Sequence, residues 1–376
     1  MGSQDCVTLF LCGDVMTGRA IDQILPHPCP PHLYESYLRS ATEYVALAEG
    51  VSGPIPRPCD FAYVWGDALR ELERRRPAAR IVNLETAVTT SEQAWPGKGI
   101  HYRMHPANVP CLTVAGLDCC VLANNHTLDW GREGLHETLA TLHDAGLRTA
   151  GAGLDLAQAC MPAHIDLPTG ARILVFACGA TDSGVSPDWA ATARRSGLCV
   201  LESFSVAVVE RIAAQVRAHK RRGDIVVMSL HWGGNWGYEV PEAHRAFARR
   251  LIEAADVDVV HGHSSHHPKT IEVFRHKLIL YGCGDFLNDY EGIGGYEAFR
   301  PDLGLMYFPT LDMATGALVQ LTMVPTQMRA LRVNRAGRAD AHWLVTMLSR
   351  TARAFGCEVQ VCPDETLALH GIEALP

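Results

Sequence analysis

Short apolar runs recur along the chain, and each one ends at a turn signal. The runs span residues 7–12, 80–84, 118–122, 172–177, 224–230, 257–260 and 277–281. Runs of this length and β-branched content predict buried strands. Amphipathic stretches lie between several of them, and this alternation predicts an α/β fold built in layers.

Three stretches carry apolar residues at helical spacing. One starts near residue 206 and is closed by Gly223, a residue suited to a helix end. Another begins at Pro241, which fits the first position of a helix. A third runs from about Glu133 to Ala145, where Gly146 ends it. These stretches predict helices that cover the strands.

The pattern changes after residue 300. Residues 303–308 and 318–324 alternate apolar and polar side chains, which predicts antiparallel strands. Trp343, Leu344 and Leu348 have helical spacing further on. We therefore predict a main domain of residues 1–325 and a small C-terminal α/β appendage of residues 326–376.

Residues 26–58 are rich in proline and follow neither periodicity. We interpret them as an irregular insertion that could cover the site as a lid, because loops of this length are uncommon unless they are functional or disordered. We find no internal repeat.

Composition narrows the class of protein. Of the 376 residues, 48% are hydrophobic and 20% are charged, as in a globular chain. A net charge of −8 argues against a broad nucleic-acid footprint, since phosphate backbones are bound by clustered Lys and Arg. Thirteen cysteines without a C-x-x-C pair indicate reduced thiols. With neither a signal-peptide pattern nor an apolar window of ~20 residues, we predict a cytoplasmic protein without a membrane partner.

Five of the predicted strands end in residues of metal-ligand type. These residues are Asp14, then Asn83 and Glu85, then Asn124, Asn125, His126 and Asp129, then His231, and finally His261, His263, His266 and His267. Each end alone has an ordinary explanation, such as a turn at Asp14, a helix cap at Glu85 or a core histidine at His231. The histidine cluster is the hardest to explain without a ligand, because imidazoles near an apolar core are costly unless something binds them.

Strand ends on one edge of an open α/β sheet form the ligand crevice, so these residues are expected to converge. Mixed carboxylate, amide and imidazole ligands suit a pair of divalent ions such as Mn, Fe or Zn. Two such ions would activate a bridging water, which is the chemistry of metal-assisted hydrolysis.

The same residues, taken in order, resemble the CapA family of poly-γ-glutamate capsule biosynthesis proteins, within the calcineurin-like metallophosphoesterase superfamily. The resemblance covers roughly residues 7–290. The motifs that carry it are GDVMTGR (13–19), NLETAVT (83–89), LANNHTLDWGREGL (122–135), SLHWGGNWGYEVP (229–241), HGHSSHHPKTIEVF (261–274) and LILYGCGDFLNDY (278–290). The resemblance implies a four-layer αββα sandwich of the metallophosphoesterase type.

The resemblance also implies roles for individual residues. It implies metal ligands at Asp14, Glu85, Asn125, His231, His263 and His266. It implies that His126, with Asp129, protonates the leaving group. The chain departs from the superfamily pattern at Met16, where a second ligand histidine usually stands, at the glutamate of position 85, and in the spacing of His263 and His266.

Other polar residues are assigned from their surroundings. Arg19 and Arg103 are candidates for holding an anionic substrate through a bidentate fork, with surface salt bridges as the equal alternative. Asn83, Asp285 and Asn288 are expected to brace the metal ligands, which metal-bound histidines usually require.

The leading functional hypothesis is a metal-dependent hydrolase that cleaves an ester, amide or phosphoester in a small acidic metabolite. Two alternatives remain. One is a non-hydrolytic component of poly-γ-glutamate or peptide assembly, as the family name implies. The other is an iron-dependent redox enzyme at the same ligands. The substrate and the oligomeric state are not readable from the sequence.

Overall fold

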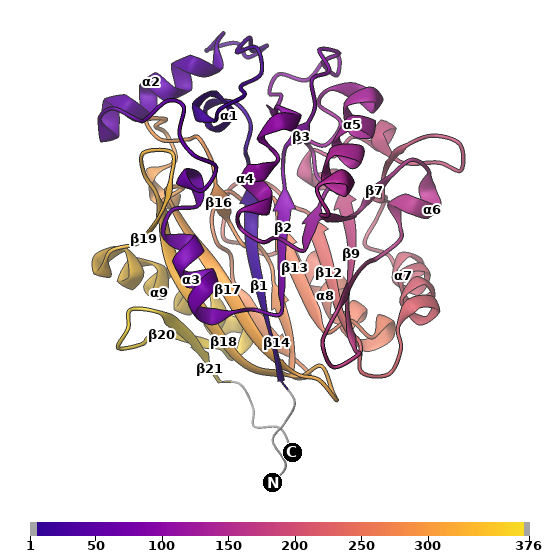
Figure 1. Cartoon of the computed structure of the whole chain (residues 1–376). Helices are drawn as coiled ribbons and strands as arrows, with labels where there is room; N and C mark the ends of the chain where they lie inside the picture. The colour runs from indigo at the N-terminus through magenta and orange to yellow at the C-terminus, as the bar shows by residue number, and fades with distance from the viewer. Residues whose placement is uncertain (1–5, 372–376) are drawn as a thin grey trace.

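The computed structural model describes residues 6–371. Two β-sheets pack face to face, and helices cover both outer faces (Figure 1). The larger sheet has the order β20-β21-β18-β17-β1-β2-β5-β6, with β16 beside β1 and β19 beside β18. The smaller sheet has the order β11-β9-β12-β13-β15-β14, with β8 beside β9. The predicted four-layer αββα sandwich is confirmed.

The sequence predicted the main strands of both sheets. The larger sheet contains β1 (Cys6–Val15), β2 (Ala79–Leu84), β5 (Cys119–Val121), β6 (Arg148–Ala150), β16 (Asp285–Leu287), β17 (Leu303–Asp312), β18 (Leu318–Met328), β19 (Val333–Arg335), β20 (Glu358–Val361) and β21 (Leu367–His370). The smaller sheet contains β8 (Ala163–Asp166), β9 (Arg172–Ala180), β11 (Val200–Leu201), β12 (Ile225–His231), β13 (Val259–His263), β14 (Ile271–Phe274) and β15 (Lys277–Leu280). Two short pairs stand apart, β3 (Ala87–Val88) with β4 (Arg103–Met104) and β7 (Ala152–Gly153) with β10 (Gly197–Leu198).

Successive side chains of the central strands enter different cores. In β1, Leu9 and Leu11 face the inner core between the sheets, whereas Phe10 points to the helices on the outer face. In β12, Val227 joins the inner core and Met228 the outer one. Because side chains alternate along a strand, a strand buried on both faces is apolar throughout. This explains the continuous apolar runs of the sequence.

Helices form the two outer layers. They are α1 (Ala20–Ile24), α2 (Ala41–Ser52), α3 (Asp67–Arg75), α4 (Pro110–Thr113), α5 (Gly131–Asp144), α6 (Leu156–Ala159), α7 (Val206–His219) and α8 (Glu242–Ala255). A further helix, α9 (Arg338–Ala352), packs against strands of both sheets. On the smaller sheet, α7 and α8 bury Val209 and Phe247 against the outer face. The predicted helices at α5, α7 and α8 are confirmed, although α7 ends at His219 and not at Gly223.

Residues 26–58 are not irregular throughout, because they contain α2. The helix starts at Ser40, whose side chain accepts a hydrogen bond from a backbone N–H while Glu43 reaches back to the backbone N–H of Ser40. Such a capping box satisfies two N–H groups that the helix cannot pair itself. Tyr44 and Val45 then bury one face of the helix. The prolines around this segment hid the signal.

The C-terminal residues continue the larger sheet. Strand β21 pairs with β18, aligning Ala368 with Thr322. Helix α9 places Leu344 and Leu348 in the inner core. The predicted boundary at residue 325 falls inside β18, and the proposed division into a domain and an appendage stays a prediction.

Strands β1 and β16 approach each other closely at Gly13. A Cβ atom on Gly13 would lie 1.6 Å from the carbonyl oxygen of Gly284. The backbone N–H of Asp14 donates a hydrogen bond to the same oxygen, at a distance of 3.0 Å. The parallel register sets Asp14 beside Asp285. Two carboxylates are thus held next to each other by backbone geometry.

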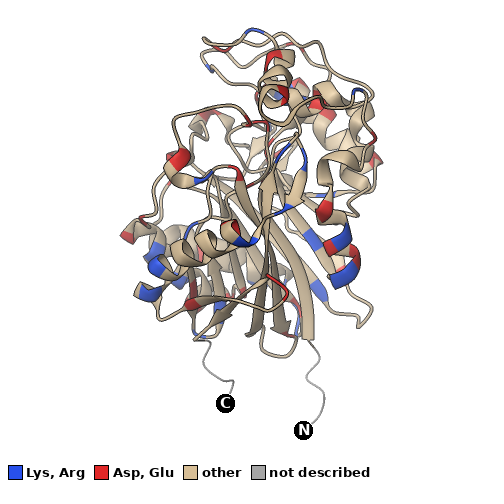
Figure 2. Ribbon diagram, turned by 90° about the vertical axis from the view of Figure 1, so that its left-hand side faces the viewer, with Lys and Arg blue, Asp and Glu red and all other residues tan. Residues whose placement is uncertain are grey.

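Within residues 6–371, no helix combines the length and the apolar character needed to cross a bilayer. Lys and Arg occur on helices, on strands and in loops, with Asp and Glu interspersed among them (Figure 2).

Candidate metal centre

The candidate site lies where the carboxyl ends of parallel strands from both sheets meet. Asp14 is near the end of β1, and Glu85 follows β2, which pairs in parallel with β1. On the smaller sheet, the register of β12 and β13 sets His231 beside His263. Carboxyl ends of neighbouring parallel strands share one edge of a sheet, so the fold brings these side chains together as the sequence predicts.

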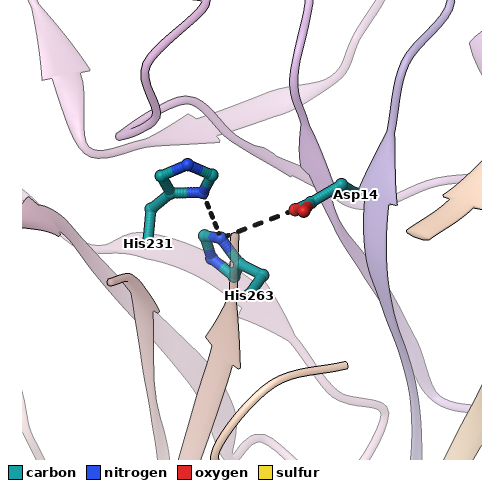
Figure 3. Close-up of side chains that lie close together, drawn as sticks. All are labelled: Asp14, His231 and His263. Atoms are coloured by element: carbon teal, nitrogen blue, oxygen red, sulfur yellow. Dashed lines mark hydrogen bonds and ion pairs between the residues drawn. The ribbon is translucent and has the colours of Figure 1, made fainter. Parts of the chain in front are cut away.

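Asp14, His231 and His263 form one compact group, and each is buried. The Nδ1 atoms of His231 and His263 are 2.8 Å apart, and His263 Nδ1 lies 3.8 Å from Asp14 Oδ1 (Figure 3). Atoms that share a metal at bond lengths of ~2.1 Å lie about 3 to 3.5 Å from one another. The group has the size of a metal coordination shell.

Asp14 belongs to a second group with His266 and Asp285. His266 Nδ1 is 2.9 Å from Asp285 Oδ1. Asn288 donates from Nδ2 to the other oxygen of Asp285 at 3.0 Å. Asp285 was expected only to brace the site, but its oxygen lies within ligand distance of the other two residues. Asp14 therefore stands between two candidate ion positions.

Glu85 and Asn125 lie at the edge of these groups. Glu85 Oε1 is 4.0 Å from His231 Nε2, and Asn125 Oδ1 is 3.1 Å from the same nitrogen. Asn83 Nδ2 donates to Asp14 Oδ1 at 2.7 Å, and its bracing of the metal ligands stays a prediction. Asn124 in turn donates to Asn83 Oδ1 at 3.0 Å, so an amide chain joins the ends of β2 and β5.

Burial dominates the electrostatics of the centre. Burial and the neighbouring Asp285 raise the pKa of Asp14 to about 7. Burial and Asp14 raise the pKa of Glu85 well above its ordinary value. The pKa values of His231 and His263 are both lowered, again mainly by burial. The chain by itself thus disfavours the carboxylate charges it has gathered, and a bound cation would stabilise them.

The donor set fits a divalent ion. Glu85 Oε2 is buried and has no hydrogen-bond partner among the described residues. A buried carboxylate oxygen without a donor is costly, whereas a cation would satisfy it. Carboxylate, amide and imidazole donors without thiolates suit Mn, Fe or Zn. The ligand role of each residue stays a prediction.

A chain of hydrogen bonds fixes which nitrogen of His263 carries a proton. His261 lies 2.7 Å from the carbonyl oxygen of Cys12 through Nε2, so this nitrogen is the donor. Burial lowers the pKa of His261 to about 4, which leaves its Nδ1 as an acceptor for the hydroxyl of Ser229, 3.0 Å away. The Ser229 oxygen then accepts from Nε2 of His263 at 2.9 Å.

The proton on Nε2 determines the state of the other ring nitrogen of His263, Nδ1. With the proton on Nε2, Nδ1 of His263 holds a lone pair directed at Asp14 and His231. Only an unprotonated ring nitrogen can bind a metal. His261 and Ser229 therefore leave Nδ1 of His263 in the form that a metal ion would require.

His126 and Asp129 form a hydrogen-bonded pair beside this centre. His126 Nδ1 donates to Asp129 Oδ2 at 2.6 Å, and His126 Nε2 lies 3.7 Å from Glu85 Oε1. Burial lowers the pKa of His126 to about 4, although Asp129 opposes the shift. Lys98 hydrogen-bonds to Asp129 and to the carbonyl oxygen of Asn125. Although burial raises the pKa of Asp129, its contacts with His126 and Lys98 lower it overall.

A cavity of about 310 Å³ opens over the centre. Its wall includes Glu85, Asn125, His126 and His266, together with Lys98. The volume is that of a small-molecule site. Lys98 gives the cavity a positive charge, which suits an anionic guest.

Arg19 and Arg103 do not line this cavity. Arg19 forms buried ion pairs with Asp289 and Glu35. The guanidinium of Arg103 donates to the carbonyl oxygen of Ser91 and lies 4.0 Å from the ring centroid of Trp130. Both guanidinium groups are engaged inside the protein, and their predicted contact with substrate stays a prediction.

Sequence reasoning missed Lys98 and Ser229, and it named His261 only as a member of the histidine cluster. Lys98 stands between two glycines in a loop, and only its basic charge close to the His126 motif could have marked it. The side chains of Ser229 and His261 lie on the same face of β12 and β13 as that of His263. The alternation of side chains along these strands could have suggested this contact. Met16 is buried, and the hydroxyl of Tyr290 donates to its sulfur at 3.5 Å.

Comparisons with known proteins identify the family of this chain. Residues 8–290 match the family described as "Bacterial capsule synthesis protein PGA_cap". A protein of Mycobacterium tuberculosis named "Probable polyglutamine synthesis accessory protein" is 47% identical over 97% of this chain and 96% of its own length. The "PGA biosynthesis protein CapA" of Bacillus subtilis is 25% identical over 76% of this chain and 64% of its own length.

Among solved structures, one described as "GAP50 the anchor in the inner membrane complex of Plasmodium" aligns with 88% of this chain and 89% of its own, at 9% identity and a TM-score of 0.36. That structural similarity supports no functional argument. The family match is more informative, because it covers three quarters of the sequence and includes the motifs around Asp14, His126 and His263. This chain belongs to the PGA_cap family of bacterial capsule synthesis proteins, which the resemblance to CapA predicted.

Proposed function

We propose that this chain serves the synthesis of a glutamate or glutamine polymer as an accessory protein, and that it does so through a divalent-metal centre. Its family and the printed names of its relatives support the first part. The shared carboxylate of Asp14, between two groups of metal-ligand type, supports the second.

We further propose that the centre is hydrolytic and cleaves an amide, ester or phosphoester in a small acidic substrate. The observation that carries this proposal is the His126–Asp129 pair, which shares its cavity with Glu85, Asn125 and His266. A structural metal site needs no such pair, whereas a leaving group needs a proton donor.

Each group in the cavity has a distinct role in the proposed hydrolysis. A divalent ion bound at this centre would supply an activated water at neutral pH. Lys98 attracts the anionic substrate into the cavity. The negative charge of the substrate raises the pKa of His126 from about 4 toward neutrality. Asp129 holds the ring by Nδ1, so that Nε2 faces the cavity and delivers the proton.

The second candidate is a non-hydrolytic role in polymer assembly. The word "accessory" in the name of the mycobacterial relative favours it. In that case the metal centre would hold the two sheets together or bind a carboxylate of the polymer. His126 would then be dispensable, whereas the metal ligands would not.

Two variants separate these candidates. His126→Ala and His231→Ala should be purified with Mn, Fe or Zn supplied, and their metal content and hydrolysis of γ-glutamyl amides and phosphoesters measured. For a hydrolase, His126→Ala keeps its metal and loses about 10²- to 10⁴-fold in turnover, while His231→Ala loses metal. Wild-type protein without stoichiometric metal after both aerobic and anaerobic preparation would contradict the whole proposal.

Polymer production in a strain lacking the gene gives the complementary measurement. If His126→Ala restores the polymer as well as the wild type and His231→Ala does not, the non-hydrolytic role is correct. If neither variant restores it, the hydrolytic role is correct.

We also propose that the chain works in the cytoplasm. Eight cysteines lie as thiols fully enclosed, or nearly so, in the apolar cores. Fractionation of cells after rapid thiol alkylation tests this, since an exported chain would appear in the extracytoplasmic fraction.

A further inference from the structure

Three thiols gather on the outer face of the smaller sheet, near the carboxyl end of β9. Cys160 follows α6, Cys178 belongs to β9, and Cys199 lies between β10 and β11. The sulfur of Cys199 is 2.9 Å from that of Cys160 and 3.3 Å from that of Cys178. Within residues 6–371, no other pair of cysteine sulfurs lies within hydrogen-bonding distance.

The cluster lines the wall of a cavity of about 620 Å³, between the outer face of the smaller sheet and α7. The wall combines the three thiols with apolar residues and with Arg211. Cys160 and Cys199 are half-buried, whereas Cys178 is buried. A small thiol reagent can therefore reach Cys160 and Cys199 through the cavity.

We propose that Cys160 and Cys199 are a redox-active pair that a low-molecular-weight disulfide oxidises to an intramolecular disulfide. The thiolate of one cysteine attacks the reagent, forms a mixed disulfide and releases one thiol. The second cysteine attacks the protein sulfur of that mixed disulfide and releases the other thiol. Two protein thiols are oxidised, the reagent is reduced to two thiols, and the two protons pass to the leaving thiolates.

The backbone around the pair makes this reaction local. Cys199 is held between the sheets, since its N–H donates to the carbonyl oxygen of Gly151 and its carbonyl oxygen accepts from the N–H of Gly179. Cys160 ends α6, a single turn of helix. A disulfide requires the sulfurs to approach by about 1 Å from their present distance. The short helix at Cys160 can make this movement while Cys199 stays in place.

Charge sets the speed of the reaction. The hydrogen bond to Cys199 and burial raise the pKa of Cys160, and the positive charge of Arg211 opposes the shift. The thiolate is the attacking species, so oxidation at neutral pH should be slow, on the scale of minutes to hours.

The test treats the folded, full-length protein with millimolar oxidised glutathione and then counts thiols after denaturation. We expect two of the thirteen thiols to be lost. Mass spectrometry of a non-reduced digest should find the peptides of Cys160 and Cys199 joined, without attached glutathione. A full count of thirteen thiols after prolonged treatment, or a disulfide between other residues, would overturn the proposal.

Two variants complete the test. Cys160→Ser should stop at a glutathione adduct on Cys199 or at a Cys178–Cys199 disulfide. Cys362→Ser is the matched control, because Cys362 is also half-buried but has no thiol neighbour among the described residues. It should form the Cys160–Cys199 disulfide at the wild-type rate. Unchanged oxidation kinetics in Cys160→Ser, or failure of the control to oxidise, would contradict the assignment.

Discussion

The two sheets bring different atoms to the candidate metal centre. The larger sheet and its loops supply oxygens, from Asp14, Glu85, Asn125 and Asp285. The smaller sheet and its loops supply imidazole nitrogens, from His231, His263 and His266. Burial raises the pKa of Asp14 and Glu85 on one side and lowers that of His231 and His263 on the other.

The contrast explains why neither sheet would suffice alone. The oxygen side gathers negative charge that its surroundings disfavour, and on the nitrogen side burial keeps the rings of His231 and His263 neutral. A cation between them would compensate the first and be ligated by the second. Metal binding should therefore stabilise the contact between the sheets as well as build the site.

The largest effect should come from the one residue common to both groups. Asp14→Ala removes an oxygen from each candidate ion position, and we expect metal affinity to fall by roughly 100-fold or more at both. His231→Ala and His266→Ala each affect one group, so each should retain part of the bound metal. Elemental analysis and calorimetric titration measure this. Asp302→Asn, which alters an ion pair with Arg300 instead, should bind metal normally.

Without a bound metal, the ionisation of buried Asp14 should lower the stability of the folded protein. Asp14 has a pKa of about 7 in the folded chain against an ordinary 3.8, so the folded state holds its proton more tightly. Stability from this group is present below pH 3.8 and is lost as pH rises toward 7, by roughly 4 kcal/mol in all. Chelated Asp14→Asn protein should escape that loss. Urea unfolding of both chelated proteins between pH 4 and 7.5 checks this, and parallel pH profiles would contradict it.

On the nitrogen side, the effect of Ser229 on the tautomer of His263 can be tested without replacing any candidate metal ligand. Ser229→Ala removes the hydroxyl that accepts from His263 Nε2. The ring can then place its proton on Nδ1, and metal affinity should fall by about 10- to 100-fold. Ser265→Ala is the matched control, because the Ser265 hydroxyl donates to a backbone oxygen and contacts no ligand side chain. Equal affinities in the two variants would show that the tautomer does not matter.

The smallest effect concerns the loop that carries Lys98 over the centre. The positive charge of Lys98 helps keep the pKa of His126 low, after burial. Lys98→Met should therefore raise that pKa above about 4, with the metal content unchanged. NMR titration of the His126 ring nitrogens measures it, with Lys220→Met, on the far flank at Asp258, as the control.

The sequence predicted the layers well because their signal is local. Strands buried on both faces must be apolar throughout, and β9, β12 and β13 stand where such runs were found. Helix α2 was missed, because prolines on both sides masked a capping box at Ser40. Strand β16 was missed as well, since its three residues are defined by pairing with β1 and not by a pattern of their own.

The site was predictable only as far as strand ends reveal it. Asp14, His231 and His263 follow from apolar runs that stop at a polar residue. The engagement of Arg19 by Glu35 and Asp289 depends on segments about 16 and 270 residues away, which no local pattern connects. The same holds for the contact of Asp285 with the Asp14 group, which arises from the register of β16.

Gly13 contributes no side chain to any of this, yet it sets the distance between the two carboxylates. Because a methyl group there would overlap the carbonyl oxygen of Gly284, any replacement must push β16 away from β1. In a library of single substitutions, position 13 should therefore be as intolerant as the ligands themselves. Anyone redesigning the centre for a different ion would have to begin at this backbone crossing before changing a single donor.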